Sequence, residues 1–168
     1  MGIKIREATA EDAFEYAANH IACWQAAYKG IISNEYLENM PIEQMAERNR
    51  ITLSEPGSFS YYYAQLNGRM IGRLVIGKCR DEDKPDQGEI AAIYLLEEFW
   101  GKGYGREMME FSLSELKRKG YGEVLIWVLE DNNRARLFYE KCGFAFDGST
   151  QEISIDKSYT EMRYGRAL

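Results

Sequence analysis

The order of apolar and polar residues predicts a strand followed by several helices in the first third of the chain. Residues 3–8 alternate between the two classes, as a half-buried strand does. Apolar side chains then recur at helical spacing from Phe14 to a predicted end near Gly30. Residues 33–37 and 42–53 predict two shorter helices.

The middle of the chain predicts three successive strands. The dipeptide Asn67-Gly68, between two strand-like runs, is a strong signal for a tight hairpin turn. A charged stretch containing Pro85 and Gly88 predicts an exposed loop. The three strands are expected at residues 58–66, 70–79 and 89–96.

The last third predicts two helices and three further strands. The basic run 117–119 before Gly120 is typical of the end of a helix. Residues 124–129 are apolar throughout, which indicates a strand covered on both faces. The last two strands are expected at residues 144–150 and 153–164.

The second of these helices has a clear beginning and end. Asn132 is a suitable N-cap, because its side chain can accept a hydrogen bond from the first turn, and Gly143 is suited to ending the helix. The apolar stripe of this helix consists of Ala135, Phe138, Tyr139 and Cys142. Together the predicted elements favour an α/β sandwich around a mixed sheet.

A glycine-rich loop occupies residues 99–106, with the sequence Phe-Trp-Gly-Lys-Gly-Tyr-Gly-Arg. Alternate glycines let the backbone turn sharply and let a bulky anion approach the amides at the positive end of the next helix. A P-loop is excluded, because Lys102 is followed by glycine. A dinucleotide fingerprint is disfavoured, because the glycines fall one residue short of Gly-x-Gly-x-x-Gly. The loop therefore predicts a pyrophosphate cradle, with a nucleotide-binding protein as an alternative.

Two blocks of sequence resemble the GNAT superfamily of N-acetyltransferases. The glycine loop resembles its acyl-CoA loop, and residues 132–144, Asn-Asn-Arg-Ala-Arg-Leu-Phe-Tyr-Glu-Lys-Cys-Gly-Phe, resemble its Asn-x-x-Ala…Phe-Tyr-Glu-Lys-x-Gly-Phe helix. Residues 24–32 are more weakly similar to a segment common in bacterial members. Two positions depart from the family pattern: Trp100 replaces the usual Gln or Arg, and Glu97 replaces a frequent Pro.

The resemblance implies the GNAT fold, an α/β architecture with a mixed, mostly antiparallel central sheet of six to seven strands flanked by about four helices. Because 168 residues suit one ordinary domain and not two, we expect a single N-acetyltransferase domain over residues 1–168. The implied activity is transfer of an acetyl group from acetyl-CoA to a primary amine, directly and within a ternary complex.

The resemblance also implies a cofactor site. The amides of the glycine loop would hold the pyrophosphate of acetyl-CoA, and the backbone of the preceding strand would pair with its pantetheine arm. Asn132 would contact CoA in addition to capping its helix. The implied cofactor-binding residues are Ile93, Tyr94, Leu95, Gly101, Lys102, Gly103, Tyr104, Gly105, Arg106, Asn132 and Tyr139.

Two residues match the acid and the base of the family. Tyr139 matches the tyrosine that protonates the departing thiolate, and the alternative is a core aromatic whose hydroxyl is tied to the backbone. Glu89 stands where many members carry the carboxylate that accepts the proton of the amine. Members differ in their base, and the alternative for Glu89 is a solvent-exposed residue at the start of a strand.

The acceptor site is implied less sharply. Trp24 and Tyr28 lie in a region that forms part of it in the family, and aromatic rings can receive a cationic or apolar amine, although simple packing is the alternative. We expect a polyamine or other small amine, with a protein N-terminus or a lysine as rival and a non-catalytic acyl-CoA-binding module as a further alternative. His20, the only histidine, is expected to face solvent or cap a helix.

Composition narrows the partners. A net charge of −6 argues against a nucleic-acid partner and suits a cationic substrate. Cys23, Cys79 and Cys142 lack Cys-x-x-Cys spacing, so we expect no disulfide framework and no metal site, and small buried hydrophobes instead. No apolar run approaches the ~20 residues of a membrane span and the N-terminus does not resemble a signal peptide, so we expect a cytoplasmic protein. Many GNAT proteins dimerise, so a homodimer is an expectation of the resemblance alone.

Overall fold

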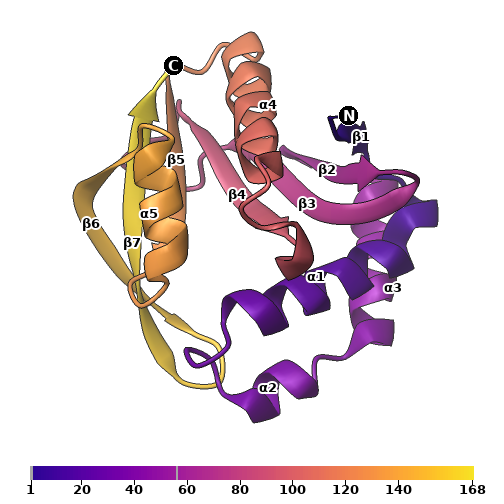
Figure 1. The fold of residues 1–168 in the computed structure, drawn as a ribbon. Coiled ribbons are helices and arrows are strands. Elements are labelled where there is room, and N and C mark those ends of the chain that lie inside the picture. Colours follow the sequence, from indigo (N-terminus) through magenta and orange to yellow (C-terminus); the bar gives the residue numbers. More distant parts are fainter. Residues whose placement is uncertain (1, 56) are drawn as a thin grey trace.

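The computed structural model describes residues 2–55 and 57–168 as a seven-stranded sheet with helices on both faces (Figure 1). The strands are β1 (Lys4–Glu7), β2 (Phe59–Leu66), β3 (Arg69–Lys78), β4 (Gly88–Leu95), β5 (Glu123–Leu129), β6 (Ala145–Ser154) and β7 (Ser158–Ala167). The α-helices are α1 (Ala13–Ala27), α2 (Asn34–Glu38), α3 (Ile42–Ser54), α4 (Tyr104–Arg118) and α5 (Asn133–Lys141), and two short 3₁₀ helices are η1 (Ala10–Asp12) and η2 (Glu97–Phe99).

The sheet is mixed and mostly antiparallel, as predicted. Its strand order is β1-β2-β3-β4-β5-β7-β6, and the β4–β5 pair is parallel whereas every other neighbouring pair is antiparallel. The strand number agrees with the expected six to seven, and the described residues form one α-helix more than the four expected.

The helices divide into two layers. On one face of the sheet, Met109 and Leu116 of α4 and Tyr139 of α5 pack against buried residues of β3, β4, β5 and β7. On the other face, Tyr16 of α1 and Leu53 of α3 pack against β2 and β3. Figure 1 shows this arrangement, with α4 and α5 on one side and α1 to α3 on the other. Each face therefore buries its own apolar core.

The central pair of strands separates soon after it begins. β4 and β5 pair only at Gly88 with Val124 and at Glu89 with Leu125, although both strands continue beyond these residues. A register shift between β3 and β4 leaves Ala91 as an extra residue, which is a β-bulge. The edge of β4 that faces β5 is therefore unpaired beyond Glu89, and Figure 1 shows the two strands diverging.

Local signals account for several turns and caps. Asn67 and Gly68 both have positive φ, at 50° and 83°, as a two-residue type I′ hairpin requires, so the predicted hairpin is confirmed. The Asn132 side chain accepts a hydrogen bond from the amide of Ala135 at 3.2 Å, so the predicted cap is confirmed. Gly143 follows α5 with a φ of 85°.

The boundary between the last two strands differs from the prediction. β6 continues to Ser154 and β7 begins at Ser158, so the turn lies at residues 155–157 and not at 151–152. The Asp156 carboxylate fixes this turn by accepting hydrogen bonds from the Tyr159 hydroxyl at 2.6 Å and from the distant Ser33 amide at 3.1 Å. A contact across so many residues leaves no local pattern in the sequence.

A buried cation ties the β3–β4 loop to the far end of the sheet. Arg163 of β7 is 4% exposed and binds the carboxylates of Asp81, Asp83 and Asp147. The bond from Arg163 lowers the pKa of Asp83. Burial opposes the same effect at Asp147, yet bonds from Ser149 and Arg163 leave its pKa lowered.

Among residues 2–55 and 57–168, no helix is long and apolar enough to cross a membrane.

Removing the charge of Arg163 should destabilise the fold in a pH-dependent way. We expect Arg163→Met to lower the free energy of unfolding at pH 7 by about 2 kcal/mol, less than for a fully buried pair because Asp83 is exposed. Arg118→Met, which removes an exposed pair with Glu115, is the control and should leave the free energy of unfolding nearly unchanged.

The pH profile checks the cause. A lowered carboxylate pKa gives stability that is present above the unfolded-state pKa of about 4 and is lost as pH falls through the lower folded-state value. Denaturant titrations from pH 7 to pH 3 should therefore bring the wild type and Arg163→Met closer together at the acidic end. A gap of constant size would contradict the charge network as the cause.

Candidate active site

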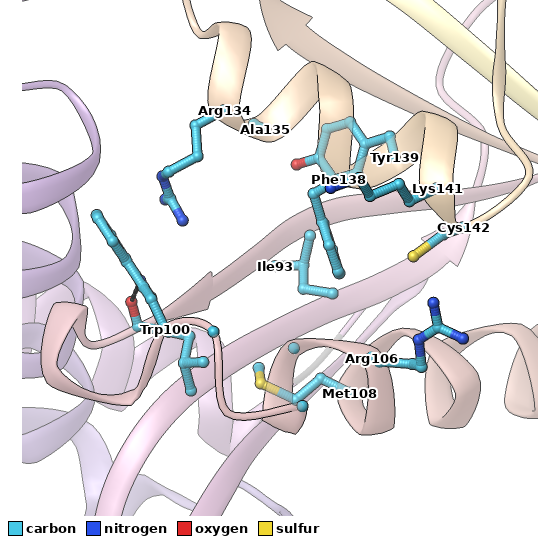
Figure 2. A pocket seen from close by; sticks show the side chains of 14 residues that line it. Ile93, Trp100, Arg106, Met108, Arg134, Ala135, Phe138, Tyr139, Lys141 and Cys142 are labelled. Atoms are coloured by element: carbon cyan, nitrogen blue, oxygen red, sulfur yellow. Dashed lines mark hydrogen bonds between the residues drawn. The ribbon is translucent and has the colours of Figure 1, made fainter.

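One pocket lies where β4, the glycine loop, α4 and α5 meet (Figure 2). Its volume of about 440 Å³ is within the range of small-molecule sites. The predicted site residues that line it are Ile93, Leu95, Gly101, Gly103, Gly105, Arg106 and Tyr139. The structure thus brings the strand, the glycine loop and the α5 tyrosine together around one space.

A smaller pocket of about 50 Å³ adjoins the first in the gap between β4 and β5. It shares Ile93, Leu95 and Tyr139 with the larger pocket and adds Tyr28, Tyr94 and Asn132. The predicted residues that line neither space are Trp24, Glu89, Lys102 and Tyr104.

The glycine loop has the backbone that an anion cradle requires. Gly101 and Gly103 have φ values of 71° and 89°, and no atom lies within 4 Å of where a Cβ would stand at either residue. The amides of Arg106 and Glu107 donate to the Gly103 carbonyl, so the amides before them precede the helical hydrogen bonding of α4. Gly105 differs: its φ is not positive, and a Cβ there would stand 3.5 Å from Phe138 of α5.

The departure at Trp100 is accompanied by a cation that the sequence interpretation missed. The guanidinium of Arg134 lies 3.3 Å from the centre of the Trp100 ring, and Trp100 Nε1 donates to the Leu95 carbonyl at 2.7 Å. Arg134, Phe138 and Lys141 all line the larger pocket. Their spacing of i, i+4 and i+7 on α5 was the available signal, because it places all three on one helical face.

Tyr139 is buried with a free hydroxyl. The residue is 8% exposed, and among the described residues its hydroxyl has no hydrogen-bond partner, unlike a core tyrosine tied to the backbone. Figure 2 shows this hydroxyl on the side of the ring that faces Arg134. Burial raises the pKa of Tyr139, so the phenol keeps its proton at neutral pH.

Glu89 is not exposed, so that alternative is wrong. It is 2% exposed, and both carboxylate oxygens accept from Arg80 Nε, at 3.2 and 3.1 Å. The Arg80 amide adds a bond of 3.1 Å, while the Arg80 side chain is largely exposed. Glu89 is therefore a buried carboxylate that the largely exposed side chain of Arg80 covers.

A second carboxylate, Glu161, was missed. It lies half-buried on β7 opposite Leu129, where it accepts a hydrogen bond from Gln151 at 2.8 Å. Burial raises the pKa of Glu161, and the charges of Glu89 and Asp81 raise it further. No local pattern marks this residue, because the strand pairing alone brings it near Glu89.

Aromatic side chains gather on the face of the sheet that α1 covers. The hydroxyls of Tyr28 and Tyr94 lie 2.7 Å apart, and burial raises the pKa of both residues. The Trp24 ring meets the Tyr28 ring edge-on, with centres 4.9 Å apart. Trp24 and Tyr28 are thus adjacent, and Tyr28 reaches the smaller pocket directly.

His20 is neither free in solvent nor a cap, so that expectation is wrong. Its side chain is half-buried on α1, and its Nδ1 contacts Nη1 of Arg73. Burial and the Arg73 charge lower the pKa of His20 to about 3. The imidazole is therefore neutral at physiological pH.

The three cysteines are free. Cys23 and Cys79 are buried as expected, whereas Cys142 is half-buried. Cys142 lines the main pocket and also an adjoining pocket of about 550 Å³ that holds Arg106, Lys141 and Arg166. Burial raises the pKa of the Cys142 thiol.

Comparison with known proteins agrees with this geometry. The model of the acetyltransferase (GNAT) family matches residues 15–144. The chain is 30% identical over 138 residues to an uncharacterized N-acetyltransferase, YuaI, of Bacillus subtilis, covering 82% of this chain and 78% of that one. It is 25% identical over 160 residues to a spermidine N(1)-acetyltransferase of Thermoplasma acidophilum, covering 95% and 99%.

A solved structure has the same fold. The crystal structure of PaiA N-acetyltransferase from Thermoplasma acidophilum, in complex with coenzyme A, superposes with a TM-score of 0.78 over the whole of both chains at 20% identity. Sequence and fold thus point to the same family, and the chain contains the glycine loop, the α5 tyrosine and the separated strands described above. The chain belongs to the GNAT family and is an N-acetyltransferase.

Proposed function

We propose that this protein moves an acetyl group from acetyl-CoA to a primary amine, with both reactants bound at once. One observation carries the proposal: a glycine loop with free amides opens into a pocket that ends at the unbonded hydroxyl of Tyr139. That arrangement offers an anion site, an apolar channel and a proton donor in line.

The residues present fit acetyl-CoA. The amides of residues 101–105 would hold its pyrophosphate, and the free edge of β4 would pair with its pantetheine arm at Ile93 and at the Leu95 amide. The Leu95 carbonyl already accepts a hydrogen bond from Trp100. Arg106 and Lys141, which line both larger pockets, supply positive charge for its phosphates. A fold neighbour was crystallised with coenzyme A, which supports coenzyme A as the class of cofactor here.

Tyr139, which lines both pockets, and Glu89, which lines neither, divide the proton transfers between them. When bound, acetyl-CoA supplies a thioester carbonyl and a thiolate leaving group. Tyr139 holds a proton at its hydroxyl and donates it to the leaving group. Glu89 accepts the proton of the amine through water, and Arg80 holds its carboxylate in place by hydrogen bonds. Cys142 is a poor nucleophile because its raised pKa keeps it a thiol, which favours direct transfer.

The acceptor would enter from the opposite face of the sheet. Trp24 and Tyr28 form an aromatic wall there, and Glu161 lies close enough to Tyr28 for its charge to raise the pKa of that residue. Glu89 acts in the same way on Glu161. Aromatic faces and carboxylates together favour a cationic amine. A relative named a spermidine N(1)-acetyltransferase supports a small amine as the acceptor class.

A substitution at Gly103 tests whether the glycine loop binds the pyrophosphate of acetyl-CoA. An alanine there must adopt a φ of 89°, which costs about 1–2 kcal/mol and displaces the loop amides, so Gly103→Ala should weaken acetyl-CoA binding at least ~10-fold by isothermal titration calorimetry. Gly120→Ala is the matched control, because its φ is 93° at the other end of α4. Equal affinity of the two variants for acetyl-CoA would overturn the cradle.

A substitution at Tyr139 tests whether this residue is the general acid that protonates the leaving thiolate. Tyr139→Phe removes a hydroxyl that no described protein group binds, so the melting temperature should hold while kcat falls about 10²- to 10⁴-fold and the KM for acetyl-CoA changes little. Tyr164→Phe, which removes hydroxyl bonds to Arg136 and Glu140, should instead cost about 1 kcal/mol of stability and keep kcat. Full kcat in Tyr139→Phe would remove the role.

Glu89 tests the base. Glu89→Gln should lower kcat by about 10²-fold and abolish the acidic limb of the pH–rate profile. If the acidic limb of the pH–rate profile is unchanged in Glu89→Gln but lost in Glu161→Gln, the general base is Glu161 and not Glu89.

A further inference from the structure

A group of nitrogen donors without acceptors lies between α1 and β3, beside the acceptor face. The buried side-chain atoms without a hydrogen-bond partner in the described residues include Asn19 Nδ2, His20 Nε2, Trp24 Nε1 and Arg73 Nε. Asn19 and Arg73 are 5% and 8% exposed, so their atoms cannot turn to bulk water. Buried donors left unpaired cost roughly 1–3 kcal/mol each, so four in one region call for an explanation.

All four atoms are hydrogen-bond donors, and for His20 this follows from its tautomer. Arg73 donates from Nη1 to Nδ1 of His20, so the neutral imidazole carries its proton on Nε2. Trp24 Nε1, Asn19 Nδ2 and Arg73 Nε can only donate. No unpartnered acceptor belongs to this group, so rearrangement within it cannot satisfy the donors.

The charge of the group is also uncompensated. Arg73 has no carboxylate within ion-pair distance among residues 2–55 and 57–168, whereas the buried Arg163 has three. The contacts of the Arg73 guanidinium are His20 and the face of the Tyr16 ring, whose centre is 4.7 Å away. Arg48 also lies close enough to act on His20, which adds positive charge. A buried cation surrounded by donors is complementary to an anion.

The group lies one side chain away from the reaction pocket. Arg73 and Tyr94 are directly opposite each other in the β3–β4 register. The Tyr94 hydroxyl bonds to Tyr28, and both tyrosines line the smaller pocket with Tyr139. His20 and Trp24 are half-buried as residues, although their unpartnered nitrogens are buried, so these two side chains lie between the group and the surface.

We propose that Arg73, His20 and Trp24 form a carboxylate-binding site that holds the acid group of the acceptor. The acceptor is then an amine that also carries a carboxylate. That the bound carboxylate belongs to the acceptor rests on the proposed acetyl transfer. A planar carboxylate suits the guanidinium fork and the adjacent ring donors, and its small size suits donors that are shielded from solvent. An acceptor with amino groups alone would leave these donors unpaired.

Acceptor pairs that differ only in charge test the site. Acetyl transfer would be measured by thiol release with ω-amino acids of increasing length, each against its own carboxamide. The wild type should prefer the acid over the amide by at least ~10-fold in kcat/KM at the best length, equivalent to about 1.4 kcal/mol. In Arg73→Met the ratio should fall close to one. Arg69→Met, which removes an exposed cation from the same strand, should keep the wild-type ratio.

Stability measurements separate this site from a structural role. Without ligand, Arg73→Met should raise the melting temperature by about 2 to 4 °C, because an apolar side chain replaces an uncompensated buried cation. Sodium acetate should raise the melting temperature of the wild type by about 2 °C or more relative to acetamide, and should not do so for Arg73→Met. Neither effect requires acetyl transfer.

The outcomes are distinct. Acetyl transfer to amines with no preference for the acid in the wild type would overturn the carboxylate site and leave the proposed function standing. Failure to acetylate any amine would end the proposed function, and the acetate arm would then decide the site alone. A fall in the melting temperature of Arg73→Met, with no effect of acetate on the wild type, would make Arg73 a structural residue and overturn the proposal.

Discussion

The early separation of β4 from β5 is the constraint on which the rest of the site depends. Two parallel strands that pair at only two positions leave backbone groups of β4 without partners in the middle of the molecule. Such groups are costly unless a ligand or water satisfies them. The bulge at Ala91 turns β4 away, and the gap admits Tyr94 from one face and Tyr139 from the other. The two faces of the sheet can therefore meet at one point.

The two sides of this gap differ in charge, within an overall charge of −6. On the side of α4 and α5, the amides of the glycine loop and the cations Arg106, Arg134 and Lys141 surround the pocket. On the opposite face, both the carboxylate of Glu161 and the buried cation of Arg73 act on Tyr94. The charged residues that line the pocket are thus all cations, which suits the proposed anionic cofactor, whereas the opposite face offers charges of both signs to the proposed acceptor.

The sequence predicts what neighbouring residues determine and misses what the tertiary structure brings together. The Asn67-Gly68 hairpin, the Asn132 cap and the glycine loop depend on local backbone preferences, and the structure has all three where expected. The cover of Arg80 over Glu89, the contact of Arg73 with His20 and the position of Glu161 depend on strand pairing. Arg134 is intermediate, because helical spacing places it on the pocket face although its partner Trp100 is remote.

We propose that the glycine loop and the free edge of β4 together form a binding site for acetyl-CoA. Isothermal titration calorimetry with acetyl-CoA, CoA, ATP and NAD in parallel is the decisive experiment. We expect micromolar binding of acetyl-CoA and CoA and no comparable binding of ATP or NAD. Folded protein that binds neither CoA species, or that binds all four ligands equally, would contradict it.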